Sequence, residues 1–380
     1  MKRIEEQEAH AALAFGDHDD RARADFAFTL RHHVTQHWMP GTRLVFDARA
    51  RHAFRAARGR DPQSPDEIRQ AMDADPWYRF YLSARRASQE AIWAAVVPPA
   101  ERLGPMPMPQ RPRGSLKLDP SVRAPAYMAA IDIHCMPGGY LLDRGEGDTA
   151  AGAVYDRGVY LYMSGLMGPR NDAVGRLAVA HLQARLPHFR PTRILDVGCG
   201  VGHATLPWAE AFPEAQVTGI DVGAALLRHA HLRAEAFGLG VEFVQADAEA
   251  TPFPDGAFDL VTSAIVLHET SIRGLRRILG ECHRLLAPGG VMLHVDQPPF
   301  DPDDPWATFL QENETHYNNE PFWRRFRHLD LAAEARAAGF GRVELGTLAA
   351  EVVRQSQNNA PDDPRARSRG FLALLAFRDG

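Results

Sequence analysis

Residues 194–202 read Ile-Leu-Asp-Val-Gly-Cys-Gly-Val-Gly, a short apolar run that leads into three alternating glycines. The pattern predicts a strand, then a tight turn through Gly198, Gly200 and Gly202, then a helix from about His203. Glycine allows a positive φ and lacks the Cβ that would block close approach of a ligand. The first N–H groups of the following helix point to the same place. The turn is therefore expected to bring backbone atoms against a bound ligand.

The composition is that of a globular protein, with 45% hydrophobic and 24% charged residues. A length of 380 residues favours two domains. The formal net charge of −5 gives no reason to expect a nucleic-acid partner, which usually requires a basic face. No apolar run approaches the roughly 20 residues of a membrane span, and the N-terminus is too polar for a signal peptide. We therefore expect a soluble, cytoplasmic protein without a membrane partner.

Two regions differ in their pattern. Residues 1–150 are predicted to be mostly helical, with a Pro- and Gly-rich arm over residues 104–125 and a helix end at Pro98-Pro99. In residues 151–380 helices and strands alternate, which favours a mostly parallel sheet covered by helices on both faces. The predicted strands are 193–197, 216–220, 241–245, 258–264, 290–295, 342–348 and 370–377. The last two strands are joined by a polar loop without a crossover helix, so they are expected to pair antiparallel.

Acidic side chains follow two further predicted strands. Asp221 ends the run Thr-Gly-Ile-Asp, and Asp247 follows the third strand. The fourth strand, 258–264, leads into Leu267-His268-Glu269. Ligands of open α/β sheets bind beyond the carboxyl ends of such strands, where a carboxylate can accept both hydroxyl groups of a ribose. These side chains and the glycine turn are therefore expected to surround one ligand.

The four motifs, in this order and spacing, make residues 193–300 resemble the class I S-adenosylmethionine-dependent methyltransferases. The resemblance is to the small-molecule branch, which includes ubiquinone and menaquinone C-methylases, and it extends from about residue 150 to the end. It implies an α/β fold, a Rossmann-like sheet of seven strands with an antiparallel last strand. It also implies S-adenosylmethionine as the cofactor. Residues 1–150 have no equivalent in the family.

The resemblance assigns the cofactor to the residues that follow the strands. The turn 196–202 would pass under its methionine half, Asp221 would bind the ribose, and Asp247 would accept from the adenine amino group. For Asp196 two interpretations stay open, a direct contact or a side chain that orients the loop. The predicted cofactor-binding set is Tyr155, Asp196, Gly198, Cys199, Gly200, Gly202, Asp221, Val222, Asp247, Ala248 and Ser263.

The acceptor side is less constrained by the sequence. His268 follows the fourth strand, where this family commonly faces the methyl group, so His268 and Glu269 are the catalytic candidates; a buried structural histidine is the alternative. The predicted substrate-binding residues are His294, Trp306, His316 and Tyr317. The turn 134–140 is a further candidate for shaping the acceptor pocket. Three dispersed cysteines without CxxC spacing give no thiolate site, and no metal is predicted.

The aromatic-rich insert 297–330 lies at the carboxyl edge of the predicted sheet. Long inserts of this kind are usually functional, so a lid over the acceptor is expected; the alternative is a helical pair that packs on the N-terminal region. Residues 1–150 would then cover the substrate or form a homodimer. The predicted reaction methylates a small, planar or apolar acceptor at oxygen, nitrogen or carbon. A protein or peptide methyltransferase with a wide groove, and a non-catalytic cofactor-binding partner protein, are the alternatives.

Overall fold

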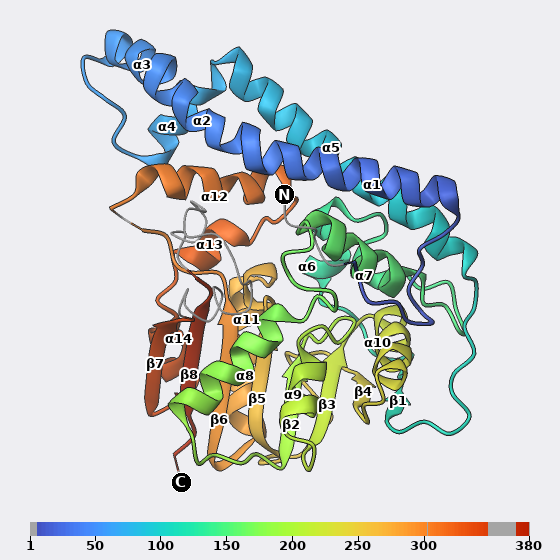
Figure 1. Ribbon diagram of the computed structural model, residues 1–380. Coiled ribbons are helices and arrows are strands. Elements are labelled where there is room, and N and C mark those ends of the chain that lie inside the picture. Colours follow the sequence, from blue (N-terminus) through green and yellow to red (C-terminus); the bar gives the residue numbers. More distant parts are fainter. Residues whose placement is uncertain (1–5, 302, 349–369, 380) are drawn as a thin grey trace.

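A mixed sheet of eight strands forms one half of the molecule (Figure 1). The computed structural model describes residues 6–301, 303–348 and 370–379. The strand order is β1-β4-β3-β2-β5-β6-β8-β7, and β8 runs antiparallel to both of its neighbours. The strands are β1 Ser115–Lys117, β2 Arg193–Val197, β3 Gln216–Asp221, β4 Glu242–Gln245, β5 Phe258–Ala264, β6 Leu286–Asp296, β7 Arg342–Thr347 and β8 Leu372–Phe377. All seven predicted strands are present, and the antiparallel pairing of the last two is confirmed; most of the loop that joins them lies outside the described residues.

The eighth strand corrects the prediction of a seven-stranded sheet. It comes from the arm 104–125, which the sequence predicts to be an extended linker. Ser115 pairs with Glu242, and β1 runs parallel to β4 at the edge of the sheet. A strand of three residues is too short to show the alternation by which strands are recognised in a sequence. The arm thereby covers an edge that would otherwise expose unpaired backbone groups.

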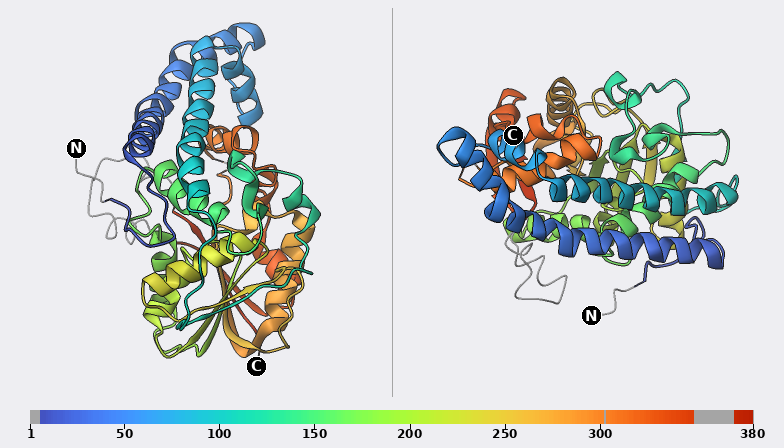
Figure 2. Two further views of the ribbon diagram at one scale, coloured as in Figure 1. Left: turned by 90° about the vertical axis from the view of Figure 1, so that its right-hand side faces the viewer. Right: turned by 90° about the horizontal axis from the view of Figure 1, so that it is seen from above.

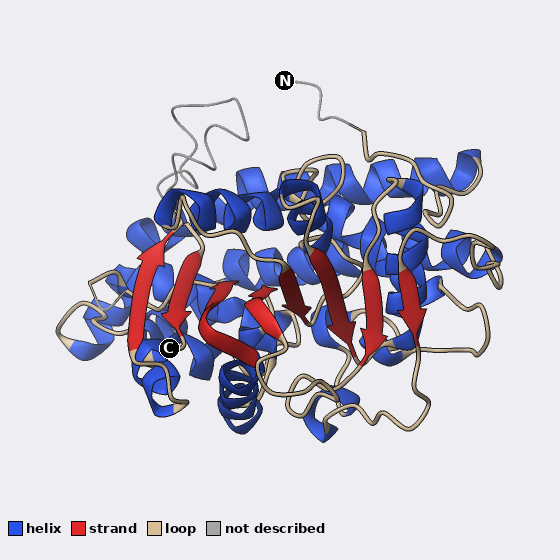
Figure 3. Cartoon of the chain, turned by 90° about the horizontal axis from the view of Figure 1, so that it is seen from below, coloured by secondary structure: helices blue, strands red, loops and turns tan. Residues whose placement is uncertain are grey.

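Helices cover both faces of the sheet (Figure 3). Neighbouring residues of β2 divide between the two faces, as the period of two in a strand requires: Ile194 joins the core under α8, α9 and α10, whereas Leu195 joins the core under α11 and α14. Both side chains are fully buried. The helices of the two layers are α8 Ala173–Arg185, α9 Thr205–Ala211, α10 Ala224–Ala236, α11 Ile272–Leu285 and α14 Leu331–Ala337. The short turn between β2 and α9 is thereby fixed at the carboxyl edge of the sheet.

Above that edge stands a layer of N-terminal helices, here called the helical cap and defined as α1 to α5, residues 18–102 (Figures 1 and 2). Its helices are α1 His18–His33, α2 Met39–Val45, α3 Arg51–Arg58, α4 Pro65–Asp73 and α5 Pro76–Arg102, with π-helical turns at Val34–Trp38 and Phe46–Ala50. The two longest, α1 and α5, lie side by side. Of the described helices, none is long and apolar enough to cross a membrane.

Helix α5 continues past the predicted end at Pro98-Pro99 to Arg102. Proline has a backbone φ that suits a helix, and its cost arises from the missing N–H and from contact with the preceding turn. Each of the two prolines removes one backbone N–H donor, so the helix loses at most two of its hydrogen bonds. Pro99 and Ala100 are buried, and this packing holds the last turn in place.

The insert 297–330 forms α12 Pro305–Tyr317 and α13 Trp323–Arg327, between the cap and the sheet (Figure 1). Phe309 of α12 is fully buried and packs with Tyr78 of α5, the ring centroids 5.6 Å apart. The Tyr78 hydroxyl donates a hydrogen bond to Asn313 Oδ1 at 3.0 Å. Trp306 packs on Phe46 of the cap. This is the packing that the second interpretation of the insert predicts.

Helix α7, Ala150–Tyr162, joins the two halves of the molecule. It packs against α5 of the cap and against α10 of the sheet layer. Gly158 lies against Trp93 of α5, where a Cβ would come within 2.3 Å of the indole ring. Gly152 lies against His229 of α10 in the same way, at 2.2 Å. Two glycines thus allow close packing on both sides, and the cap is held firmly over the sheet.

Candidate active site

The glycine turn after β2 has the predicted backbone. Gly198, Gly200 and Gly202 have φ of 67°, 52° and 79°, the left-handed region that favours glycine. The Cys199 N–H donates to the carbonyl of Ile220 in β3 at 2.9 Å, which fixes the turn against the sheet. A Cβ on Gly198 would lie 2.9 Å from the Val266 side chain. The turn therefore tolerates no larger side chain at this point.

Asp221, at the end of β3, is held by backbone donors. Its Oδ2 accepts from the Gly200 N–H, and its Oδ1 from the Gly223 N–H, each at 2.9 Å. Burial raises the pKa of this carboxyl group, and the backbone donors oppose the rise. The carboxylate is thus fixed beside the glycine turn, with lone pairs left for further donors.

Of the carboxyl groups of Asp196, Asp221 and Asp247, that of Asp196 has the most strongly shifted pKa. Its Oδ2 accepts from the Thr205 hydroxyl at 2.5 Å, and Thr205 is the first residue of α9. Its Oδ1 is buried without a hydrogen-bond partner among the described residues. Burial raises the pKa of Asp196 to about 7. Both interpretations of Asp196 find a structural basis, because one oxygen orients the start of α9 while the other is unpaired.

One cavity of about 810 Å³ runs from this turn to the helical cap. Of the predicted cofactor-binding residues, those that line it are Tyr155, Asp196, Gly198, Cys199, Gly200, Asp221, Val222, Asp247 and Ala248. Gly202 and Ser263 lie outside the lining. Ser263 instead hydrogen-bonds His294 Nδ1 at 2.6 Å, on the face of the sheet where Cys282 of α11 lies. Successive side chains of β5 point to opposite faces, and the sequence does not show which face Ser263 takes.

The insert contributes a different face of α12 to the cavity than the sequence predicts. Trp306 lines the cavity, as do Leu310 and Glu314, four and eight residues further on. His316 and Tyr317 do not line it. His316 is exposed, and Tyr317 packs in the core shared with the cap. His294 is buried in β6 and also lies outside the lining. Three of the four predicted substrate-binding residues therefore do not line the cavity.

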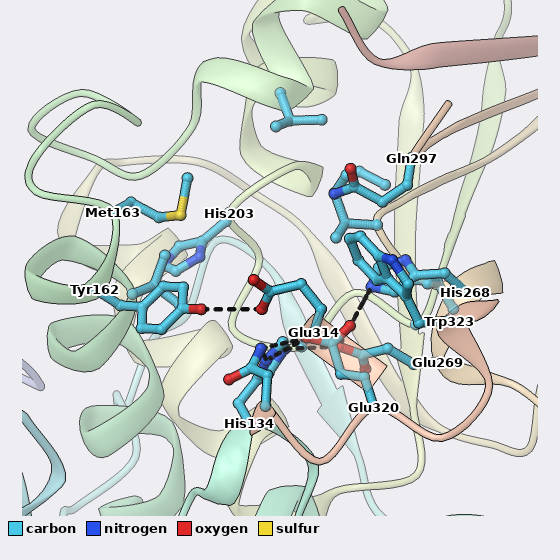
Figure 4. Close-up of a pocket in the computed structure, with 18 of the residues that line it drawn as sticks. His134, Tyr162, Met163, His203, His268, Glu269, Gln297, Glu314, Glu320 and Trp323 are labelled. Atoms are coloured by element: carbon cyan, nitrogen blue, oxygen red, sulfur yellow. Dashed lines mark hydrogen bonds and ion pairs between the residues drawn. The ribbon is translucent and has the colours of Figure 1, made fainter. Parts of the chain in front are cut away.

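Two histidines, His134 and His268, and two carboxylates, Glu269 and Glu320, meet at the cavity wall (Figure 4). His268 Nδ1 lies 2.6 Å from Asp296 Oδ1, and its Nε2 lies 3.5 Å from Glu320 Oε2. His134 Nε2 lies 2.9 Å from Glu269 Oε1, and its Nδ1 lies 3.2 Å from Glu320 Oε1. Glu320 thus lies between the two imidazoles, and His268 and Glu269, the predicted catalytic pair, belong to this one cluster.

The carboxylates govern the charge of both imidazoles. Burial lowers the pKa of His268, but the Asp296 carboxylate outweighs it and the pKa rises to about 9. Burial also lowers the pKa of His134, but the Glu320 and Glu269 carboxylates outweigh it and raise the pKa well above its usual value. The carboxylates therefore favour the cationic form of both imidazoles, and neither is a free base in that form.

His134 shows how a turn far from the sheet reaches the site. It lies in the 3-10 turn Ile133–Cys135 with φ of 57°, in the left-handed region. The Trp93 indole N–H donates to its carbonyl at 3.0 Å, and the Gln89 amide donates to the same oxygen. Two residues of α5 therefore hold the strained backbone, and the expectation that the turn 134–140 reaches the pocket agrees with its lining by His134 and Tyr140.

Comparison with known proteins connects this geometry to a family. Residues 194–290 match the family model described as a methyltransferase domain. The demethylmenaquinone methyltransferase of Thermus thermophilus is 45% identical over 109 residues, 29% of this chain and 49% of that protein. This part of the chain is an S-adenosylmethionine-dependent methyltransferase domain. The ubiquinone/menaquinone biosynthesis C-methyltransferase of Methylobacterium nodulans is 39% identical over 119 residues, 30% of this chain and 46% of that protein.

The matches concern the sheet more than the whole molecule. The chain spans about half the length of the curated relatives it matches. A solved phosphoethanolamine N-methyltransferase 2 of Haemonchus contortus, in complex with S-adenosyl-L-methionine, is 17% identical with a TM-score of 0.44. That match covers 59% of this chain and 57% of the other. The family match at residues 194–290 excludes the helical cap and α12.

The methyltransferase domain offers groups that suit its cofactor. S-Adenosylmethionine carries a sulfonium and an amino group but no phosphate, so carboxylates rather than a free helix N-terminus are its complement. Asp196, Asp221 and Asp247 line one end of the cavity together with the glycine turn. The unpaired Asp196 Oδ1 is a ready acceptor for a cationic donor. The residues present therefore fit the cofactor.

A second histidine cluster lies apart from the glycine turn, around Asp156. His10 and His229 each place Nε2 3.0 Å from Asp156 Oδ2, and the three side chains have a spacing that a metal ion can occupy. The Arg233 guanidinium lies 3.5 Å from the same oxygen. The positive charge of Arg233 would repel a divalent metal ion at this place. Burial raises the pKa of Asp156, but His203 and the other donors lower it well below its usual value. The cluster is therefore a hydrogen-bonded network around Asp156, with Arg233 as its counter-ion, and it ties the N-terminal segment to α7 and α10.

Proposed function

We propose that the chain transfers a methyl group from S-adenosylmethionine to a small organic acceptor held between the sheet and the helical cap. One observation carries the proposal: a single cavity joins the glycine turn to the cap. Its volume of about 810 Å³ lies within the range of small-molecule sites. The acceptor end is bounded by residues of α1, α2, α7 and α12. The cap and the insert together act as the cover.

The residues at the acceptor end exclude water and align the acceptor. S-Adenosylmethionine, when bound, supplies an electrophilic methyl group attached to a sulfonium. In-line displacement at such a centre depends mainly on alignment and desolvation. Met163, Leu166 and Trp306 give this end an apolar lining, which favours a planar or apolar acceptor.

The cluster of His134, His268, Glu269 and Glu320 provides hydrogen bonds rather than a free imidazole base. His268 donates through a nitrogen whose ring is fixed by Asp296. The Glu269 carboxylate accepts from His134 and, at 3.2 Å, from the Tyr140 hydroxyl. We propose that Glu269 accepts a proton or a hydrogen bond from the acceptor nucleophile, and that His268 donates to a neighbouring polar atom.

Three observations favour this proposal over the alternatives. A protein or peptide substrate needs a wide groove, whereas α1, α2 and α12 all contribute side chains to the cavity wall. Relatives named for demethylmenaquinone and for trans-aconitate support a small organic acceptor. A non-catalytic role is disfavoured because the glycine turn, Asp221 and Asp247 are all retained in one site.

The test of the cofactor is calorimetric titration of the full chain with S-adenosylhomocysteine. Asp221→Ala is expected to weaken binding by about tenfold or more, because hydrogen bonds to a charged acceptor contribute about 1.5–3 kcal/mol each. Asp255→Ala is the control, since that exposed carboxylate pairs with Arg284 outside the cavity lining. Absence of binding by the wild type, or equal binding by the Asp221 variant, would refute the assignment.

A further inference from the structure

Arg31 of α1 is a buried cation without a carboxylate partner among the described residues. Its side chain is 4% exposed and lines the cavity. Among the described residues its Nε and Nη1 have no hydrogen-bond acceptor, and no carboxylate forms an ion pair with it. Its guanidinium lies over the Tyr162 ring, 4.0 Å from the centroid. A buried charge without a paired counter-ion is costly, and a bound anion would remove this cost.

The neighbouring charges leave Arg31 unmatched. Burial raises the pKa of Glu314 of α12, but the charges of Arg85 and Arg31 outweigh it and lower the pKa, and Glu314 already forms an ion pair with Arg85 of α5. Glu314 also accepts from the Tyr162 hydroxyl at 3.4 Å (Figure 4). Two arginines therefore face one glutamate, and one positive charge remains. The carboxylates of the other cluster are engaged by His134 and His268.

A structural role at the helix end does not account for Arg31. Cations near the last turn of a helix can stabilise its free carbonyl groups. Here α1 continues without a break into the π-helical turn Val34–Trp38, so its carbonyl groups are not free. The cation–π contact with Tyr162 accounts for the position of the guanidinium, but it leaves the Nε and Nη1 donors without an acceptor among the described residues.

We propose that Arg31 binds an anionic group, a carboxylate or a phosphate, at the end of the acceptor remote from the methyl group. The inference rests on the proposed function and specifies its substrate class: an apolar body with an acidic end. Trp306, Leu310 and Met39 line the same side of the cavity and contact the apolar part. Charge-assisted bonds from guanidinium to either anion are among the strong ones in proteins.

The test is calorimetric titration of the full chain, with and without saturating S-adenosylhomocysteine. The probes are 2-naphthoate and octanoate, each beside its neutral amide, with 2-naphthyl phosphate added to distinguish phosphate from carboxylate. We expect at least one acid to bind about tenfold or more tightly than its neutral counterpart. Arg31→Gln should abolish this preference, and Arg31→Lys should retain part of it. Arg21→Gln, at an exposed position of the same helix, should leave it unchanged.

Each outcome decides between the roles. Equal binding of the acids and amides, absence of binding by all probes, or a preference that survives Arg31→Gln overturns the inference. A large fall in the melting temperature of Arg31→Gln, together with an acid preference that the same variant leaves unchanged, would assign a structural role to Arg31 instead. Absence of S-adenosylhomocysteine binding would overturn the proposed function separately, because the acid preference is also measured without it.

Discussion

Replacement of Asp196 by asparagine should stabilise the ligand-free protein at neutral and alkaline pH. The carboxyl group is 1% exposed, and burial raises its pKa from 3.8 to about 7. An acid whose pKa is raised on folding binds more protons in the folded state, so stability falls as the pH rises between the two values. Asparagine keeps an oxygen for the Thr205 hydroxyl and never ionises.

The size of the effect follows from the two pKa values. Each pKa unit corresponds to about 1.36 kcal/mol, so a rise from 3.8 to about 7 costs the folded state about 4 kcal/mol once Asp196 is fully ionised. The cost is absent below the lower value and complete above the higher one. The wild type should therefore lose about 4 kcal/mol relative to Asp196→Asn between about pH 4 and pH 8.

The assay is urea unfolding of both proteins, followed by circular dichroism at several pH values across that window. Asp259→Asn is a control of opposite sign: burial raises its pKa, but hydrogen bonds from Arg193 and Thr192 outweigh this and lower it. That variant should lose stability relative to wild type as the pH rises. If the difference in the free energy of unfolding between wild type and Asp196→Asn stays constant with pH, the pKa of Asp196 is not raised by burial and the prediction is wrong.

Four further substitutions test the cap, the insert and the histidine cluster. Phe309→Ala should destabilise the protein by about 3–5 kcal/mol in urea unfolding, because the ring is fully buried, whereas Trp306→Ala should mainly raise the KM of the acceptor. Equal effects of Trp306→Ala on the KM of acceptor and cofactor would contradict a lid. His268→Asn should lower the free energy of unfolding by about 3 kcal/mol below pH 6.5, because folding raises the pKa of His268 to about 9. The difference from wild type should disappear as the pH rises through about 9. A difference that does not change with pH would contradict the ion pair. Tyr78→Phe should cost about 1 kcal/mol by removing the bond to Asn313, and an unchanged midpoint would show that this bond is replaced.

The cofactor end of the cavity was predictable because its residues are local to strand ends. Gly198, Asp221 and Asp247 each follow a predicted strand directly, and parallel strands bring their carboxyl ends to one edge. Ser263 shows where this reasoning stops. It lies within a strand that is buried on both faces, so its direction depends on which helix layer it meets, and the pattern of apolar residues is alike on both sides.

The acceptor end was less predictable, because α12 has no polar face by which to orient it. Phe309 and Tyr317 pack in the core shared with the cap, and Trp306 and Leu310 contact the same core while they also line the cavity. The apolar residues of α12 therefore do not separate into a core face and a cavity face, and the amphipathic pattern that normally identifies the buried side is missing. The burial of Arg31 could not be predicted from the sequence, because it depends on contacts with segments far along the chain, such as Tyr162.

The acceptor site therefore depends on the docking of the cap rather than on the sheet alone. His134 meets Glu269 only because Gln89 and Trp93 of α5 hold its carbonyl and maintain a left-handed backbone. Such a conformation costs about 1–3 kcal/mol and persists only where surrounding contacts enforce it. If α5 moved, the His134 turn would relax and Glu269 would lose its hydrogen bond from His134. The methyl-donor end is built by the sheet itself, so substitutions in the cap should change the choice of acceptor while leaving cofactor binding intact.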